Sequence, residues 1–256
     1  MANKVSGVIS VAVGGNLTCL VIKDCTEMFP SVKGHYGERN LTSATGKYDF
    51  IVEYKGEKYV MGTLAKYDCD MPIQMHTNSK QNDYFDMSVL VAIHQYGYMS
   101  NNLVVSVPIK MHNTEEKNGR ISRLKGSHTI TVNGERKTFV INDVRVAPES
   151  AVAYWIDEPQ GKVRFLDIGS RTLGYATTLS EYGDLRFIDT DSGTIFGKGV
   201  EALGDAYNPK GLADFICGRL ARSWGEKDKV YLLGGGALDD TLVGYIKHYF
   251  SNAEVM

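Results

Sequence analysis

The order of strand, hairpin and helix repeats in the two halves of this 256-residue chain, and it restricts the possible folds more than any single motif does. In each half, an apolar strand enters a glycine turn and returns as a second strand, with a helix further along. The first turn begins at Gly14 and the second at Gly169. This order predicts a mixed α/β chain whose architecture is duplicated although its sequence is not.

Apolar spacing and turn residues place the expected elements. Asn133-Gly134 supplies the positive φ of a tight hairpin turn, and apolar residues recur at helical spacing over 85–96. Pro148 suits the start of a helix, with Glu149 in its first turn. We expect strands or hairpins over residues 5–22, 48–61, 103–107, 128–146, 163–189 and 230–233, and helices over 85–96 and 115–124, from 148, between 194 and 230 (two helices), and from 237.

The composition excludes several classes of protein. The 28 basic and 30 acidic side chains leave a formal net charge of −2, so the chain has no overall bias toward nucleic acid or acidic membranes. No run of about 18 apolar residues occurs, and we expect no membrane span. The N-terminal apolar stretch is short and interrupted by glycines, which indicates a first strand rather than a signal peptide. Four scattered cysteines without a CxxC pair indicate a reducing compartment, so the expected location is cytoplasmic.

The strongest local motif spans residues 165–172, where an apolar strand ends at Asp167 and a turn begins at Gly169. Glycine lets the backbone approach a ligand, and successive N–H groups of such a turn can point at phosphate oxygens. A carboxylate at the strand end can hold a hydrated Mg²⁺ that neutralises phosphate charge. The competing interpretation is an ordinary hairpin that uses aspartate as a turn former.

A second motif is the buried strand 230–233, which runs into Gly234-Gly235-Gly236 and then a helical segment. Backbone N–H groups and the dipole at a helix N-terminus favour anions, so this arrangement suits a nucleotide. The alternative is a flexible connection between strand and helix. Because three consecutive glycines cost backbone entropy on folding, we favour a binding role.

Two further segments indicate a nucleotide site only in combination with these motifs. Glu149 suits the first turn of a helix, where an acidic side chain interacts favourably with the helix dipole. The first hairpin, residues 10–18, has glycines and an amide where a phosphate could bind, but it has no carboxylate.

In this order, the segments resemble the actin-like ATPases, and most closely the bacterial plasmid-segregation actins of the ParM and AlfA type. The resemblance covers nearly the whole chain, and it is specific because several motifs occur in register. It rests on 11–18 and 167–172 as two phosphate hairpins, 29–32 (FPSV) after the first hairpin, 59–65 with Gly62, 124–128 with Asn133-Gly134, 147–154 as a connecting helix, and 234–237 as the adenosine motif.

The resemblance implies an actin-like, two-lobed fold of the ribonuclease H-like (ASKHA) class, with duplicated mixed-sheet α/β domains. Domain I would span residues 1–155, with subdomain IB inserted over 31–80, and domain II would span 156–256. ATP or GTP with Mg²⁺ would be the ligands. Asp167 would hold Mg²⁺ through water, and Glu149 would orient or activate the hydrolytic water. The residues expected to contact the nucleotide are Gly14, Gly15, Asn16, Leu17, Gly169, Ser170, Arg171, Thr172, Gly234, Gly235 and Gly236.

The sequence departs from the family pattern at the first hairpin. The family carries aspartate two residues before the first glycine, where this chain has Ala12, and Cys19 falls near the position of the usual lysine. Asp24 lies at the far end of the strand and is an unsuitable replacement. We therefore expect altered Mg²⁺ dependence or slow hydrolysis, with nucleotide binding less affected.

The length of the chain is the second departure. Residues 194–230 have room for two helices, whereas a complete actin fold inserts a whole subdomain there. Subdomain IIB is therefore expected to be missing or reduced, as in AlfA-type proteins. The chain also ends at Met256, soon after the last expected helix, where relatives usually have a final strand or tail.

The function implied by the resemblance is a nucleotide-dependent filament that drives plasmid DNA segregation, with NTP hydrolysis timing disassembly. Its partners would be further copies of the chain and a DNA-binding adaptor of the ParR type, with DNA contacted only indirectly and no membrane. One alternative is a small-molecule kinase of the same superfamily, similar to type III pantothenate kinases, although residues 104–110 lack the acidic base it needs. The other is a nucleotide-binding regulator with weak catalysis, because of Ala12.

Overall fold

The computed structural model describes residues 6–23, 25–41, 46–73 and 81–256, which divide into two units. Unit 1 comprises Met1–Ser106 and Asn113–Ala147, and unit 2 comprises Val107–His112 and Pro148–Met256. The chain enters unit 2 briefly at Val107 and passes into it again at Pro148, while the domain boundary at residue 155 stays a prediction. The short segment after the strand that ends at Val107 also belongs to unit 2.

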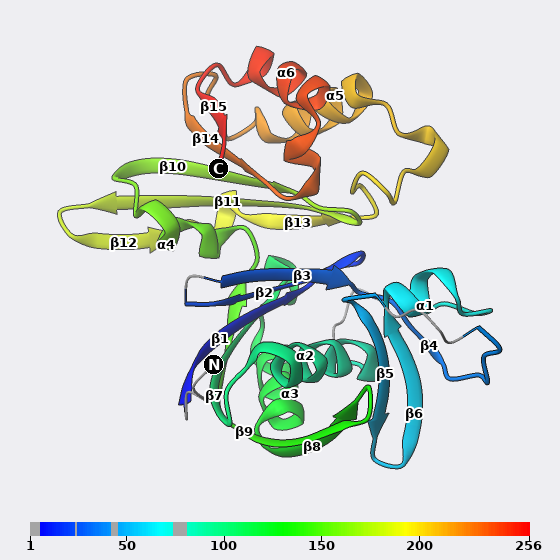
Figure 1. Ribbon diagram of the computed structural model, residues 1–256. Coiled ribbons are helices and arrows are strands. Elements are labelled where there is room, and N and C mark those ends of the chain that lie inside the picture. Colours follow the sequence, from blue (N-terminus) through cyan, green and yellow to red (C-terminus); the bar gives the residue numbers. More distant parts are fainter. Residues whose placement is uncertain (1–5, 24, 42–45, 74–80) are drawn as a thin grey trace. The chain divides into compact units, whose positions relative to one another are not determined.

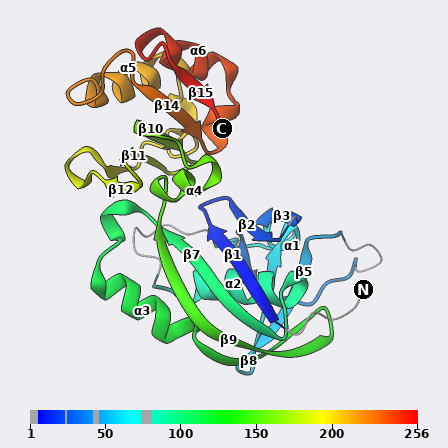
Figure 2. The ribbon, with the colours of Figure 1, turned by 90° about the vertical axis from the view of Figure 1, so that its left-hand side faces the viewer.

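Unit 1 is built on one mixed sheet, which curves around helices α2 (Asp83–Tyr96) and α3 (Thr114–Leu124) (Figures 1 and 2). The strand order is β3-β2-β1-β7-β9-β8-β5-β6-β4, and β1 pairs with β7 in parallel. The strands are β1 Ser6–Val13, β2 Leu17–Ile22, β3 Cys25–Pro30, β4 Lys33–His35, β5 Asp49–Tyr54, β6 Glu57–Gly62, β7 Ser100–Val107, β8 Gly126–Val132 and β9 Glu135–Pro148.

Helix α2 supplies much of the core of unit 1. The Asn82 side chain caps its first turn by accepting a hydrogen bond from the Phe85 N–H at 2.9 Å. Phe85 and Val89 are fully buried in the same cluster as Ile9 and Val11 of β1. The helices of this unit are α1 Thr63–Tyr67, α2 Asp83–Tyr96 and α3 Thr114–Leu124, so the helices predicted over 85–96 and 115–124 are confirmed.

Unit 2 has a sheet of order β12-β11-β10-β14-β15, with β13 pairing to β11. The side chains of β10 pack into two separate hydrophobic clusters, one on each face of the strand. Leu166 and Ile168 pack with α5 and α6, whereas Val163 and Phe165 pack with Tyr154 of α4. Its elements are α4 Tyr154–Asp157, β10 Gly161–Ile168, β11 Thr172–Glu181, β12 Asp184–Phe187, β13 Gly193–Phe196, α5 Pro209–Leu220, β14 Lys229–Leu233, α6 Asp240–Tyr249 and β15 Ala253–Val255.

The hairpins predicted from turn residues are present. Asn133 and Gly134 have φ of 51° and 81°, the pair of positive angles that a two-residue turn between β8 and β9 requires. The meander predicted over 163–189 is formed by β10, β11 and β12. The segment expected to be a first strand is β1, which begins at Ser6.

Three expectations about helices and the chain end are wrong. The region 194–230 has one α-helix, α5, instead of two, because backbone N–H groups of residues 197–202 bond to a hairpin turn rather than to one another. The last helix begins at Asp240, since the Asp239 side chain accepts the N–H groups of Thr241 and Leu242; residues Gly235–Leu238 form a 3₁₀ turn. A final strand does follow this helix, because β15 pairs in parallel with β14.

Within the described residues, no helix has both the length and the hydropathy needed to span a membrane. None of the four cysteines forms a disulfide.

Candidate functional site

The turn between β10 and β11 forms the centre of the candidate site in unit 2. Ile168 pairs with Leu173, and the Gly169 N–H donates to Thr172 O at 3.0 Å, which closes a four-residue turn. Asp167 is half-buried at the end of β10, where it pairs with Leu233 at the end of the parallel strand β14. The carboxylate therefore lies at the carboxyl edge of two parallel strands, where α/β sheets bind ligands.

A later segment, residues 197–202, supports this turn from one side. The N–H groups of Val200 and Gly197 donate to the carbonyls of Gly169 and Arg171 at 3.1 and 3.0 Å. The carbonyl of Ser170 accepts from residues 201 and 202, both at 2.9 Å. Sequence reasoning missed this segment, although Gly199 is a signal for it, because a Cβ there would overlap the backbone of Ser170 and Arg171.

Peptide geometry then sets the direction of the turn's amides. The described peptide bonds are trans, and in a trans peptide the C=O and the following N–H point in opposite directions. Because three consecutive carbonyls bind residues 197–202, the N–H groups of Ser170, Arg171 and Thr172 all point away from that segment. Successive N–H groups that face the same side of a turn suit an anion.

The glycine loop after β14 lies against Asp167. Gly234 has a φ of 79°, and a Cβ there would overlap Asp167 Oδ1 and approach Ile168 O to 2.7 Å. A Cβ at Gly236 would overlap the Ile168 side chain. Both glycines are therefore required for the loop to approach the hairpin, and the two strongest sequence motifs meet in space. Because the Asp239 side chain caps α6, these glycines do not form the N-terminus of that helix.

Glu149 joins the same part of unit 2, but not from a helix. Strand β9 continues to Pro148, and the Glu149 N–H donates to Val107 O at 2.8 Å, which corrects the expectation that Pro148 starts a helix. The first helical turn, Ala151–Ala153, begins only after Ser150, whose φ of 65° is incompatible with a helix. Ser150 packs against Gly174, the residue opposite Asp167 in the β10–β11 pair.

The first hairpin in unit 1 has the same geometry as the second. Val13 pairs with Thr18, and the Gly14 N–H donates to Leu17 O at 2.9 Å. A segment after the hairpin again supports the turn, since the Ser31 N–H donates to Asn16 O at 2.7 Å. The buried hydroxyls of Ser31 and Thr18 are 2.7 Å apart and hydrogen-bonded. The serine of the FPSV motif at 29–32 therefore has a structural role in holding the first hairpin.

This equivalence identifies the residue that corresponds to Asp167. Gly14 matches Gly169, and therefore Ala12 matches Asp167. Ala12 pairs with Cys19, whose thiol pKa is raised by burial, so a neutral thiol faces the position that lacks a carboxylate. Asp24, considered as a replacement, lies outside the described residues.

The described residues also limit the kind of metal site that the chain can build. Among them, no three His, Cys, Asp or Glu side chains gather closely enough to hold a metal ion. A single carboxylate such as Asp167 fits a hydrated Mg²⁺, which usually keeps several waters and is bound together with substrate phosphates.

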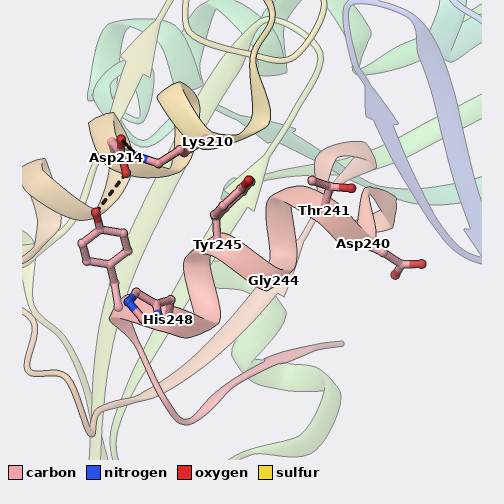
Figure 3. A pocket seen from close by; sticks show the side chains of 8 residues that line it. Lys210, Asp214, Asp240, Thr241, Gly244, Tyr245 and His248 are labelled. Atoms are coloured by element: carbon pink, nitrogen blue, oxygen red, sulfur yellow. Dashed lines mark hydrogen bonds and ion pairs between the residues drawn. The ribbon is translucent and has the colours of Figure 1, made fainter.

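An open hollow of about 540 Å³ between α5 and α6 contains none of these residues (Figure 3). Asp214 in this hollow bonds to Lys210 Nζ at 2.7 Å and to the Tyr249 hydroxyl at 2.9 Å, and these bonds lower its pKa. The acid at the centre of this hollow is therefore already paired, and the hairpin region is the better candidate site.

Comparisons with known proteins identify the family and the fold of the chain. A family model described as the N-terminal domain of actin-like proteins matches residues 12–151. No curated protein matches the sequence significantly.

The chain resembles several solved structures at low sequence identity. An AlfA filament bound to AMPPNP is 18% identical, with 97% of this chain and 88% of that chain covered and a TM-score of 0.73. A 15-stranded ParM filament from Clostridium botulinum is 14% identical, with coverage of 99% and 95% and a TM-score of 0.74. The archaeal actin homologue Ta0583 in complex with ADP is 14% identical, with coverage of 96% and 91% and a TM-score of 0.73. These matches confirm the predicted actin-like α/β fold.

Proposed function

Because this chain belongs to the actin-like protein family, we propose that it binds a nucleoside triphosphate and assembles into filaments with it. One observation carries the proposal: within unit 2, the second hairpin turn, Asp167 and the glycine loop at 234–236 meet at the ends of β10 and β14. Ser150, the residue after Glu149, packs against Gly174 opposite Asp167. The AMPPNP of the AlfA filament and the ADP of Ta0583 support an adenine nucleotide as the first ligand to test.

The hairpin turns would hold the phosphates. Gly14 and Gly169 each use their N–H to close a turn, so the amides nearer the tips, such as those of Gly15 and Ser170, are the proposed phosphate donors. Gly234 to Gly236 would flank the nucleoside. Mg²⁺, when bound, neutralises phosphate charge, and Asp167 would hold its water shell.

The proposed reaction is hydrolysis of the terminal phosphate. The oxygen of a water bonds to the γ-phosphorus, and the bond from that phosphorus to the β–γ bridging oxygen breaks. Glu149 orients the water and accepts one of its protons, which then passes to solvent, while the other proton stays on the released phosphate. Because Ala12 stands where the second carboxylate would be, we expect this reaction to be slow.

The filament would act in plasmid segregation. AlfA and ParM form filaments in the structures that this fold resembles, which supports self-assembly as the main interaction. The net charge of −2 suits attachment to DNA through an adaptor of the ParR type rather than directly. We place the protein in the cytoplasm. With only α5 as an α-helix between β13 and β14, we infer that subdomain IIB is reduced.

A second candidate function is favoured by one observation. The register that equates Ala12 with Asp167 leaves the first hairpin without an acid, as expected of a nucleotide-binding regulator with weak catalysis. Such a protein would bind ATP without releasing phosphate.

The test combines electron microscopy, light scattering and phosphate release at tens of micromolar protein, with ATP, GTP or no nucleotide. Filaments are expected only with nucleotide. Glu149→Ala should assemble but lose phosphate release by roughly 100-fold or more, because it removes the group that orients the water. Glu181→Ala, an exposed acid at the end of β11, is the matched control and should behave as the wild type.

The outcomes separate the candidate functions. Particles that never exceed a small oligomer would contradict the filament, whereas bound ATP without turnover would favour the regulator. Unchanged phosphate release in Glu149→Ala would remove Glu149 from its proposed role.

A further inference from the structure

Ser150 combines three features that disfavour folding. Its φ of 65° and ψ of −55°, with the Ala151 N–H donating to Glu149 O at 2.7 Å, form a γ-turn of the rare, strained kind. Of the described non-glycine residues with positive φ, Ser150 is the buried one, at 4% exposure. Its Oγ is buried without a hydrogen-bond partner among the described residues. Strain and unpaired polar atoms persist mainly where function maintains them.

The γ-turn holds the backbone of Glu149 on both sides. The Glu149 N–H donates to Val107 O at 2.8 Å, and the Glu149 carbonyl accepts the Ala151 N–H at 2.7 Å. Moving the Cα of Glu149 would break one of these bonds. The conformation of Ser150 therefore sets where the Glu149 side chain starts and in which direction it leaves the backbone.

The side chain of Ser150 occupies the space that Gly174 leaves on β11. A Cβ at Gly174 would overlap Ser150 Oγ, and it would lie 3.6 Å from Asp167 Cβ. Gly174 is also the cross-strand partner of Asp167. The contact between Ser150 and Gly174 thus joins the turn that carries Glu149 to the strand position opposite Asp167.

We propose that Ser150 is a positioning residue, whose contact with Gly174 maintains the γ-turn and so orients the Glu149 carboxylate relative to Asp167. This inference rests on the proposed function, because it assigns Ser150 a part in the hydrolysis that Glu149 performs. Ser150 acts through Glu149 and needs no contact with the nucleotide.

The first test exchanges the side-chain volumes at Ser150 and Gly174, which fill one shared space. Ser150→Ala leaves the space at Gly174 empty, and Gly174→Ala displaces Ser150 Oγ, so each should lower kcat for phosphate release by roughly 10- to 100-fold. The affinity for ATP, measured with AMPPNP, should stay within about twofold because neither side chain is proposed to bind it. The double variant returns a methyl group to the same space and should recover most of the activity. Thr178→Val removes another buried, unpaired hydroxyl four residues along β11 and serves as the control, expected to hydrolyse ATP like the wild type.

The second test asks whether Ser150 acts through Glu149. In a Glu149→Ala background, adding Ser150→Ala should cause no further loss of phosphate release. A merely structural role predicts an additional loss, together with weaker AMPPNP binding and a changed near-UV circular dichroism spectrum.

The results distinguish the two levels of the proposal. If the wild type hydrolyses ATP and both single variants do so equally fast, Ser150 has no positioning role and the proposed function stands. If the losses of the single variants simply add in the double variant, the contact with Gly174 is not the cause. A wild type that binds ATP without hydrolysing it would overturn the positioning role of Ser150 together with the proposed hydrolysis, and it would favour the nucleotide-binding regulator.

Discussion

At the scale of single residues, Gly234 connects the glycine loop to the carboxylate. We predict that Gly234→Ala weakens nucleotide binding at least about tenfold, because the new Cβ must displace Asp167 Oδ1 and Ile168 O. Its backbone angles, φ 79° and ψ 177°, are adopted almost only by glycine, so a side chain adds strain on the order of 1–3 kcal/mol. Isothermal titration with AMPPNP and a thermal melt would separate these two effects.

Gly183→Ala is the matched control for backbone strain. Gly183 has a φ of 86° in the β11–β12 turn, and a Cβ there meets nothing within 4 Å. This variant should lose stability but keep its affinity for AMPPNP. Equal affinity losses in both variants would show that strain, rather than the position of Asp167, determines binding.

His94 gives unit 1 a dependence on pH. The ring is 2% exposed, Nε2–H donates to Glu135 O at 2.9 Å, and Nδ1 accepts from the Gln95 amide at 2.9 Å, so the neutral form fits. Burial, with Lys137 nearby, lowers the pKa below the usual 6.5. In the unfolded chain His94 takes up a proton near pH 6.5, whereas the folded ring does not, so stability falls as the pH decreases below that value.

The prediction can be checked with urea unfolding at pH 7.5 and 5.5. His94→Gln retains a donor and an acceptor but cannot be protonated, so it should lose less stability between the two pH values than the wild type. His248→Gln on the exposed surface of α6 should keep the wild-type slope. Parallel losses in the wild type and His94→Gln would contradict this account.

At the scale of elements, Arg164 ties β10 to two later segments of unit 2. Its side chain is 1% exposed and bonds to Asp228 at 2.8 Å, to Asp191 at 2.9 Å and to Ser223 O at 2.9 Å. Burial raises the pKa of Asp228, but its bonds to the Gly225 N–H and to the guanidinium outweigh this effect and lower it. The guanidinium therefore neutralises two carboxylates that come from different loops.

We predict that Arg164→Met destabilises unit 2 by about 3 kcal/mol, because it leaves these carboxylates without a counter-charge. Lys162→Met, an exposed change on the same strand, should alter the free energy of unfolding by no more than about 0.5 kcal/mol. Chemical denaturation at neutral pH measures both values. Similar small losses in the two variants would mean that the loops relax and hydrate the acids.

Hydrogen bonds from later segments of the chain also hold the turns of the two glycine hairpins in place. Each hairpin turn has carbonyls bonded by a segment that comes later in the chain, Ser31 for the first and residues 197–202 for the second. The amides that face the opposite side are thereby fixed before any ligand binds. A site organised in advance loses less entropy when it binds a phosphate.

At the scale of the whole molecule, the two hairpins have the same strand register and the same turn-closing hydrogen bond, but only the second carries a carboxylate. We predict that Ala12→Asp, which places a carboxylate at the position matching Asp167, lowers the Mg²⁺ concentration needed for phosphate release by roughly 10- to 100-fold. A Mg²⁺ titration of phosphate release at saturating ATP measures this change. Ser10→Asp adds the same charge two residues earlier on β1 and should leave the titration unchanged. If both variants shift it equally, general electrostatics rather than a metal contact is responsible.

Local sequence patterns were sufficient for much of the fold and for part of the site. Turn pairs such as Asn133-Gly134, apolar runs ending in Asp167 or Leu233, and helical spacing over 85–96 each encode their structure within a few residues. The order of these motifs also predicted the actin-like family, and the count from Gly14 back to Ala12 exposed the missing acid.

Only the tertiary structure decided how those motifs meet. The γ-turn at Ser150 depends on Val107 and Gly174, the support of the second turn depends on residues 197–202, and β15 exists because β14 offers an edge. These features arise from backbone hydrogen bonds and close contacts between residues far apart in the chain. Local propensity contains no information about such partners, because the free energy that selects them is available only once the sheet has formed.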